Sequence, residues 1–138
     1  MAKMVLKNCF IKVDGTNFSD HIESVEIVLK KDELDTTNFG GTGHESVHGM
    51  KKDSFKLKFH QDFAASSVDA VLYPLWDGEL SFTVEVRPTS DAVSATNPSY
   101  TGTCKLFEYA PLHGSVGKLS ETDIKLPSMQ NGITRAIA

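Results

Sequence analysis

The stretch FKLKFH, residues 55–60, alternates large apolar and polar side chains more regularly than any other part of the chain. Successive side chains of a β-strand point to opposite faces, so Phe55, Leu57 and Phe59 lie on the same face. We expect that face to lie in the core. The stretch therefore predicts a strand, and the sequence on either side of it decides what kind of sheet it joins.

Further alternating segments lie on both sides of this strand, separated by turn signals such as Asp14-Gly15 and Asn131-Gly132. The predicted strands, including residues 55–60, cover residues 5–13, 23–31, 55–60, 80–87, 100–110, 119–126 and 133–138. We expect the second of them to pair with the first. The segment 100–110 carries apolar side chains on both faces, with Leu106 opposite to Phe107, which predicts burial on both sides.

One helix is predicted between residues 66 and 76, where apolar side chains recur at helical spacing behind Ser66. Asp69 lies three residues after Ser66, as in a variant capping box. Pro74 lacks the backbone N–H that a helix interior uses, so we expect the helix to be short, to be kinked or to end near Tyr73. Trp76 is expected to fill the core.

These elements predict a mainly β fold, an antiparallel β-sandwich or barrel with one flanking α-helix and a long early loop. At 138 residues, the chain is expected to form a single domain, residues 1–138. Cys9 and Cys104 have no CxxC spacing and are expected to be reduced and buried.

The charge of the chain argues against DNA as a bound ligand, because its 18 Asp and Glu residues outnumber its 14 Lys and Arg residues. Lys3, Lys7 and Asn8 interrupt the apolar start of the chain, and no stretch is apolar enough for a membrane span. We therefore expect synthesis and folding in a cytoplasm and no membrane partner.

Residues 32–49 interrupt the strand pattern with a polar, glycine-rich segment that is expected to be a loop. Loops longer than about 12–15 residues are usually functional or disordered. The segment contains His44, Glu45 and His48 in the H-E-x-x-H order of zinc proteases, which requires a helix to bring both imidazoles to one metal. The surrounding glycines disfavour that helix. We predict no metal site, no cofactor and no enzymatic activity, and both histidines are expected to be exposed.

Several short motifs follow one another along nearly the whole chain. They are VDG at residues 13–15, FSDHI at 18–22, DTTNFG at 35–40, FHQDF at 59–63, VEVRP at 84–88, ATNPSYTG at 95–102, YAPL at 109–112 and VG at 116–117. Taken together in their order and spacing, they resemble the major tail tube proteins of long-tailed (siphovirus-type) bacteriophages.

This resemblance implies a structural virion protein, made in the host bacterial cytoplasm, that forms hexameric rings. The rings stack into the phage tail tube, and DNA passes through the lumen during ejection without specific binding. Further partners implied are the tail terminator, tape measure and baseplate-side tail proteins. The long loop becomes the candidate inter-ring connector, with these site residues: Asp35, Thr36, Thr37, Asn38, Phe39, Gly40 and Gly41.

Two other readings of the sequence stay open. A non-catalytic β-sandwich binding module, such as a virion accessory or carbohydrate-binding domain, would remain small in solution at high concentration. The tube protein of a related injection device or gene transfer agent would assemble in the same way as a phage tube. In either tube reading, we expect the inter-ring loop to be mobile in free subunits and ordered after docking.

Overall fold

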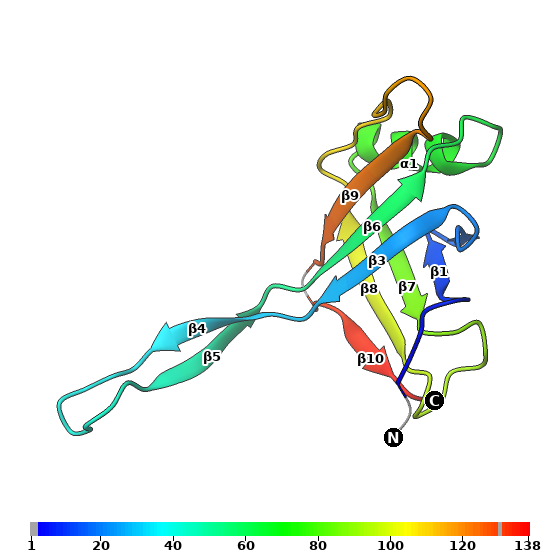
Figure 1. Ribbon diagram of the computed structural model, residues 1–138. Helices are drawn as coiled ribbons and strands as arrows, with labels where there is room; N and C mark the ends of the chain where they lie inside the picture. Colours follow the sequence, from blue (N-terminus) through cyan, green and yellow to red (C-terminus); the bar gives the residue numbers. More distant parts are fainter. Residues whose placement is uncertain (1–2, 130) are drawn as a thin grey trace.

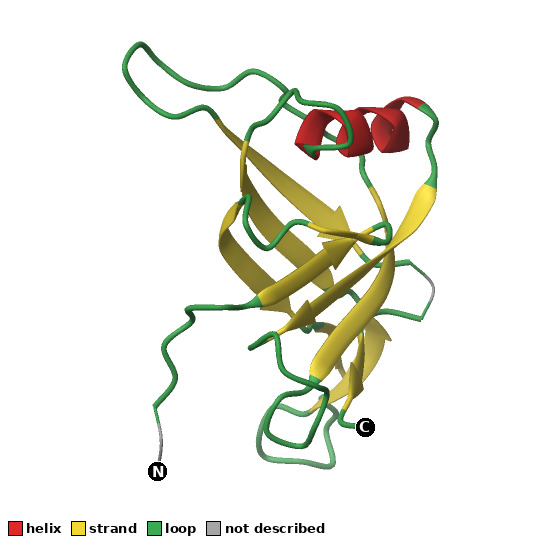
Figure 2. Cartoon of the chain, turned by 90° about the vertical axis from the view of Figure 1, so that its right-hand side faces the viewer, coloured by secondary structure: helices red, strands yellow, loops and turns green. Residues whose placement is uncertain are grey.

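A computed structural model describes residues 3–129 and 131–138, and two antiparallel sheets pack face to face in it (Figures 1 and 2). The five-stranded sheet has the order β10-β8-β7-β1-β2 and contains β1 (Phe10–Val13), β2 (Thr16–Asn17), β7 (Ser81–Arg87), β8 (Ser99–Lys105) and β10 (Thr134–Ala136). The three-stranded sheet has the order β3-β6-β9 and contains β3 (Ile22–Val28), β6 (Ser54–His60) and β9 (Glu121–Pro127). The predicted mainly β sandwich with one helix is confirmed.

The most regular stretch of the sequence forms the central strand β6 of the three-stranded sheet, as predicted. Phe55, Leu57 and Phe59 are at most 2% exposed and face the core, which they share with the inward side chains of β1 and β7. Burying an aromatic or leucine side chain stabilises a fold by about 1.5–3 kcal/mol. Strand β6 therefore fixes the sandwich at its centre.

The pairing of the early strands differs from the prediction. Strand β1 begins at Phe10 and pairs with β2 and β7, whereas β3 pairs with β6. Alternation along a strand shows which face is buried, but it carries no information on the neighbouring strand. Strand β8 ends at Lys105, so Phe107 lies outside it and is 65% exposed. The predicted burial on both sides of residues 100–110 is therefore wrong.

The helix α1 (Val68–Asp77) covers one end of the sandwich, next to the end of β6 (Figure 1). It begins after Ser67 rather than Ser66, without a side-chain capping bond, and it continues past Pro74. The N–H of Gly78 donates to the carbonyl oxygen of Pro74 at 2.9 Å, which closes the last turn. No helix among the described residues is long and apolar enough to cross a membrane.

Trp76 lies at the surface, 43% exposed, and does not fill the core as predicted. Because the helix continues through Pro74, its buried stripe runs through Val68, Leu72 and Leu75, and Trp76 falls beside that stripe. The indole N–H donates to the carbonyl oxygen of Phe107 at 3.2 Å. The side chain thus ties the helix to the segment that follows β8.

Candidate functional site: a projecting hairpin arm

The segment between β3 and β6 leaves the sandwich as a β-hairpin, at the end of β6 opposite to α1 (Figure 1). Strands β4 (Lys31–Asp35) and β5 (Ser46–Lys51) pair only with each other among the described residues, and every residue of β4 is exposed. We call residues 31–51 the arm and the remainder the body. The loop predicted for residues 32–49 is thus wrong at both ends, which are strands. Because both faces of the hairpin are exposed to solvent, its sequence lacks the alternation of apolar and polar residues that predicts a strand.

The tip of the arm is organised by short-range hydrogen bonds from its own polar side chains. The Asp35 carboxylate accepts from the Thr37 N–H at 2.8 Å, and the Asn38 side-chain oxygen accepts from the Gly40 N–H at 2.9 Å. The Thr37 hydroxyl oxygen accepts from the Glu45 N–H at 2.9 Å. Such Asx and Ser/Thr bonds stabilise turns. The bonds from the Thr37 hydroxyl and amide also lower the pKa of Asp35.

All seven residues predicted as the inter-ring site lie at this tip or at its junction with β4. The polar bonds of the tip leave Phe39 without cover, and its side chain is fully exposed. Apolar side chains that the sequence reading missed continue along the arm, because Leu34 lies opposite Val47 in the ladder and Met50 follows. Each of these three is about half exposed or more. The arm therefore carries apolar surface that the body leaves uncovered.

The H-E-x-x-H string lies on the arm and not on a helix, since His44 is in the tip and His48 is in β5 opposite Glu33. Both histidines are exposed, as predicted. Among the described residues, the one group of three potential metal ligands within 4.8 Å of one another lies elsewhere, on the outer face of the three-stranded sheet, and consists of Glu23, His60 and Glu121. The Lys58 ammonium already binds Glu121 there at 2.9 Å, so a positive charge is present beside the carboxylates.

Two motifs that carry the family resemblance meet at the entrance to α1. The imidazole of His21 lies 2.9 Å from the Asp20 carboxylate through Nδ1 and 3.0 Å from Asp62 Oδ2 through Nε2, and a carboxylate oxygen accepts in such a bond. The bond to Asp20, followed by that to Asp62, raises the pKa of His21. Ser67 donates to the same Asp62 oxygen at 2.7 Å. Because imidazole and hydroxyl both bind this one oxygen, His21 is not placed to take a proton from Ser67, and the cluster is structural.

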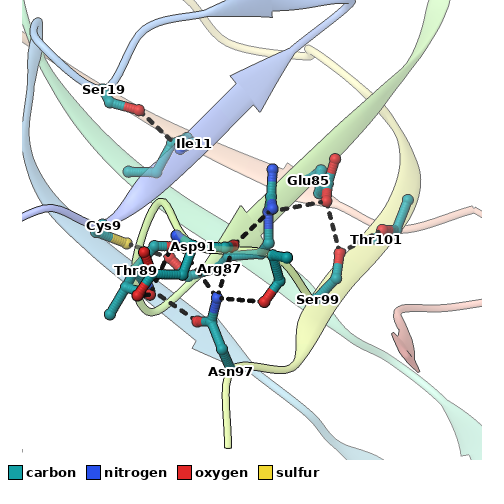
Figure 3. A network of polar contacts seen from close by, with 11 residues as sticks. Cys9, Ile11, Ser19, Glu85, Arg87, Thr89, Asp91, Asn97, Ser99 and Thr101 are labelled. Atoms are coloured by element: carbon teal, nitrogen blue, oxygen red, sulfur yellow. Dashed lines mark hydrogen bonds and ion pairs between the residues drawn. The ribbon is translucent and has the colours of Figure 1, made fainter. Parts of the chain in front are cut away.

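Two further motifs meet in a polar network at the opposite end of the body (Figure 3). Asn97, which is 5% exposed, donates to the carbonyl oxygen of Asp91 at 2.9 Å, and Arg87 donates to that oxygen at the same distance. Glu85 pairs with Arg87 at 3.3 Å and accepts from the Ser99 hydroxyl at 2.8 Å. The network fixes the loop between β7 and β8. These motifs thus hold the body together and leave the arm as the candidate site.

No protein-family model matches the chain, and no curated protein matches it in sequence. Solved structures do match. A chain from the virion of a native gene transfer agent particle is 14% identical, with 96% of this chain and 99% of that chain covered and a TM-score of 0.72. A chain from the tail of an empty gene transfer agent particle, refined with C6 symmetry, is 14% identical over 94% of each chain, with a TM-score of 0.67.

A chain of the SPP1 tail tube is 12% identical, with 95% of this chain and 76% of that chain covered and a TM-score of 0.70. Identities this low establish a shared fold. The predicted likeness to tail tube proteins is therefore confirmed at the level of the fold.

Proposed function

We propose that this chain is a structural subunit of a virion tail tube, which assembles into hexameric rings that stack into a conduit for DNA. The observation that carries the proposal is the projecting arm with its uncovered apolar side chains, on a body whose fold recurs in a tail with C6 symmetry. Exposed apolar side chains of this kind are typical of surfaces that become buried in an assembly.

The ring contact is assigned to the edges of the three-stranded sheet. Strands β3 and β9 are the outer strands of this sheet. An open edge offers unpaired N–H and C=O groups to another strand. When the β3 edge of one copy pairs with the β9 edge of the next, the contact is heterologous, and a rotation of one sixth of a turn between neighbours closes it into a ring of six. This pairing would also protect both edges from aggregation.

The contact between rings is assigned to the arm, with the tip residues Asp35, Thr36, Thr37, Asn38, Phe39, Gly40 and Gly41 at its centre. Each ring presents six arms at once, so weak single contacts add up through effective concentration. The remaining partners, a terminator and baseplate-side proteins at the tube ends and a tape measure inside, follow from the same proposal. A chain of a contractile injection system sheath/tube terminator shares the fold too, so the proposal extends to the tubes of related devices.

Assembly tests the proposal directly. Purified protein is concentrated stepwise and followed by sedimentation and by negative-stain electron microscopy. We expect rings with six subunits and tubes built from them. A chain that stays monomeric up to about 1 mM, where even a contact of about −4 kcal/mol is half formed, contradicts the proposal and favours the non-catalytic β-sandwich binding module.

A further inference from the structure

The regular strand pairing is interrupted where the arm meets the body, and a single backbone bond, from the N–H of Lys52 to the carbonyl oxygen of Lys30 at 2.7 Å, crosses the gap. Pairing in the three-stranded sheet ends at Val28 and Ser54, and pairing in the arm begins again at Lys31 and Lys51. Residues 29–30 and 52–53 join the two ladders, and we call them the joint. A hairpin bends most easily where its ladder is interrupted, so the joint needs other contacts if the arm is to hold one angle.

Asp53 lies in this joint with its side chain 1% exposed. One carboxylate oxygen accepts from the N–H of Lys30 at 2.9 Å, and the other accepts from the N–H of Ile133 at 2.9 Å. The first bond holds the chain that leads from β3 into the arm, and the second reaches the segment just before β10. A buried carboxylate is costly unless it is hydrogen-bonded and paired, so these contacts define one geometry.

Lys51, the last residue of β5, adds the charge partner. Its ammonium lies 3.4 Å from the Asp53 carboxylate and donates to the carbonyl oxygen of Ile133 at 3.0 Å. Gly132 has a positive φ of 66°, and a Cβ there would lie 2.7 Å from the Asp53 carboxylate and 2.8 Å from the Lys51 side chain. Only glycine lets the chain before β10 approach so closely.

We propose that Asp53 and Lys51 form a clamp that fixes the angle of the arm on the body and couples it to the chain before β10. Asp53 is thus a positioning residue for the arm. The consequence for stacking rests on the proposed function, but the clamp itself is a property of the single chain. Six arms on one ring dock together only when they share one angle, and a loose arm lowers the effective concentration of its tip at the docking site.

The arm angle is measured by pulsed electron paramagnetic resonance on dilute protein. Spin labels are placed at Gly43→Cys, where a side chain meets open space, and at the exposed Asp123→Cys on β9. The background carries Cys9→Ser, and Cys104 is buried. We expect a narrow distance distribution that becomes at least about twofold broader in Asp53→Asn, because the amide presents a donor to Ile133 and to Lys51. An unchanged distribution overturns the clamp.

A label pair within the body controls for general loosening. Asp77→Cys at the end of α1 and Asp123→Cys should give the same distribution with and without Asp53→Asn. If both pairs broaden equally, the residue supports the body and does not position the arm, which also overturns the clamp.

A second variant covers the case in which Asp53→Asn does not fold. Lys51→Met removes the ammonium and leaves the carboxylate its two amide donors, so we expect a smaller broadening of the arm distribution. Lys52→Met is the matched control, since the Lys52 side chain makes no hydrogen bond or ion pair among the described residues. Equal distributions for Lys51→Met and Lys52→Met contradict the proposal.

A tube-assembly assay tests whether the clamp matters for stacking. We expect Asp53→Asn to need about tenfold more protein for half-assembly than the parent chain. If the parent forms no tubes, the proposed function fails while the distance measurement still decides the clamp. If tubes form but the arm distribution of the variant stays narrow, the clamp fails alone.

Discussion

Phe39 has a fully exposed aromatic side chain, which is unfavourable in an isolated subunit. Its ring is fully exposed at the end of the arm, on a turn that its polar neighbours hold in place. Single exposed apolar residues are common on protein surfaces. An aromatic ring on a projecting tip, followed by Leu34, Val47 and Met50 along the same arm, is better explained by a surface that becomes buried.

Replacing this ring should weaken assembly without weakening the body. Burial of a phenylalanine side chain is worth about 1.5–3 kcal/mol, so we expect Phe39→Ser to raise the protein concentration for half-assembly by about tenfold or more. Sedimentation measures this. Unfolding by urea should change by less than about 0.5 kcal/mol.

Val116→Ser is the matched control, because Val116 is also a fully exposed apolar residue but lies in a loop of the body. It should leave assembly unchanged. Equal assembly by Phe39→Ser and the parent chain would remove the tip from the ring-to-ring contact.

His21 should make the stability of the body depend on pH. Its pKa is raised in the folded chain by Asp20 first and Asp62 second, so its contribution is full below the unfolded value of 6.5 and is lost as pH rises through the folded pKa. We expect the free energy of unfolding to fall by less than about 1 kcal/mol between about pH 5.5 and about pH 8, because solvent screens the partly exposed ring. Urea titrations at both pH values measure the change.

His21→Gln should abolish this difference, whereas the exposed His113 should not affect it when changed to Gln. The lowered pKa values of Asp20 and Asp62 act in the opposite direction, since their contribution is lost as pH falls through the folded pKa. Both carboxylates remain ionised across the tested range. A pH profile that survives His21→Gln would contradict the assignment.

At the scale of elements, the sequence predicts those strands that have one face in the core. Strands β6 and β7 alternate because the packing of the sandwich demands it, and their predicted positions agree with the structure to within a residue. The arm strands β4 and β5 have solvent on both sides, so nothing in packing imposes a pattern on them. These two strands are held by hydrogen bonds to each other, and a segment of polar residues and glycine gives no sequence pattern that would predict such pairing.

The candidate site was predicted only in part. The seven tip residues follow from the family resemblance and from the length of the interruption between strands. Asp53 could not be predicted, because it looks like any loop aspartate next to a strand, and its partners Lys30 and Ile133 are far from each other in sequence. Its burial is a consequence of tertiary packing, which no local pattern encodes.

Shortening the arm should separate ring formation from stacking. In the test variant, Leu34 and Val47 are joined by Asn-Gly, which favours a two-residue hairpin turn and keeps the start of the ladder. The body and its sheet edges remain, so we expect single rings and no tubes in negative-stain micrographs. Loss of rings as well would place the arm in the contact within a ring.

The strands of the arm are hydrogen-bonded to each other, so we expect mobility in free subunits only at the tip. Amide exchange of the tip should become slower when the subunits assemble.

At the scale of the whole molecule, the net charge of −4 argues against DNA as a bound ligand and is compatible with the proposed tube, through which DNA would pass. Binding to phosphates depends on clustered Lys and Arg that release counterions. We expect no change in the fluorescence anisotropy of a labelled duplex of about 30 base pairs at physiological salt, with subunits or with tubes. Saturable binding under these conditions would contradict the role of an inert conduit.

The arm leaves one end of β6 and α1 covers the other end, so the two ends of the subunit are chemically different (Figure 1). In the proposed tube, rings built from such subunits would stack with every arm pointing the same way, which would give the tube a polarity. One mouth of the tube then displays six unoccupied arms, and the other mouth displays six unoccupied docking surfaces. Growth at the two mouths therefore uses different surfaces. A protein that caps one mouth has no reason to fit the other.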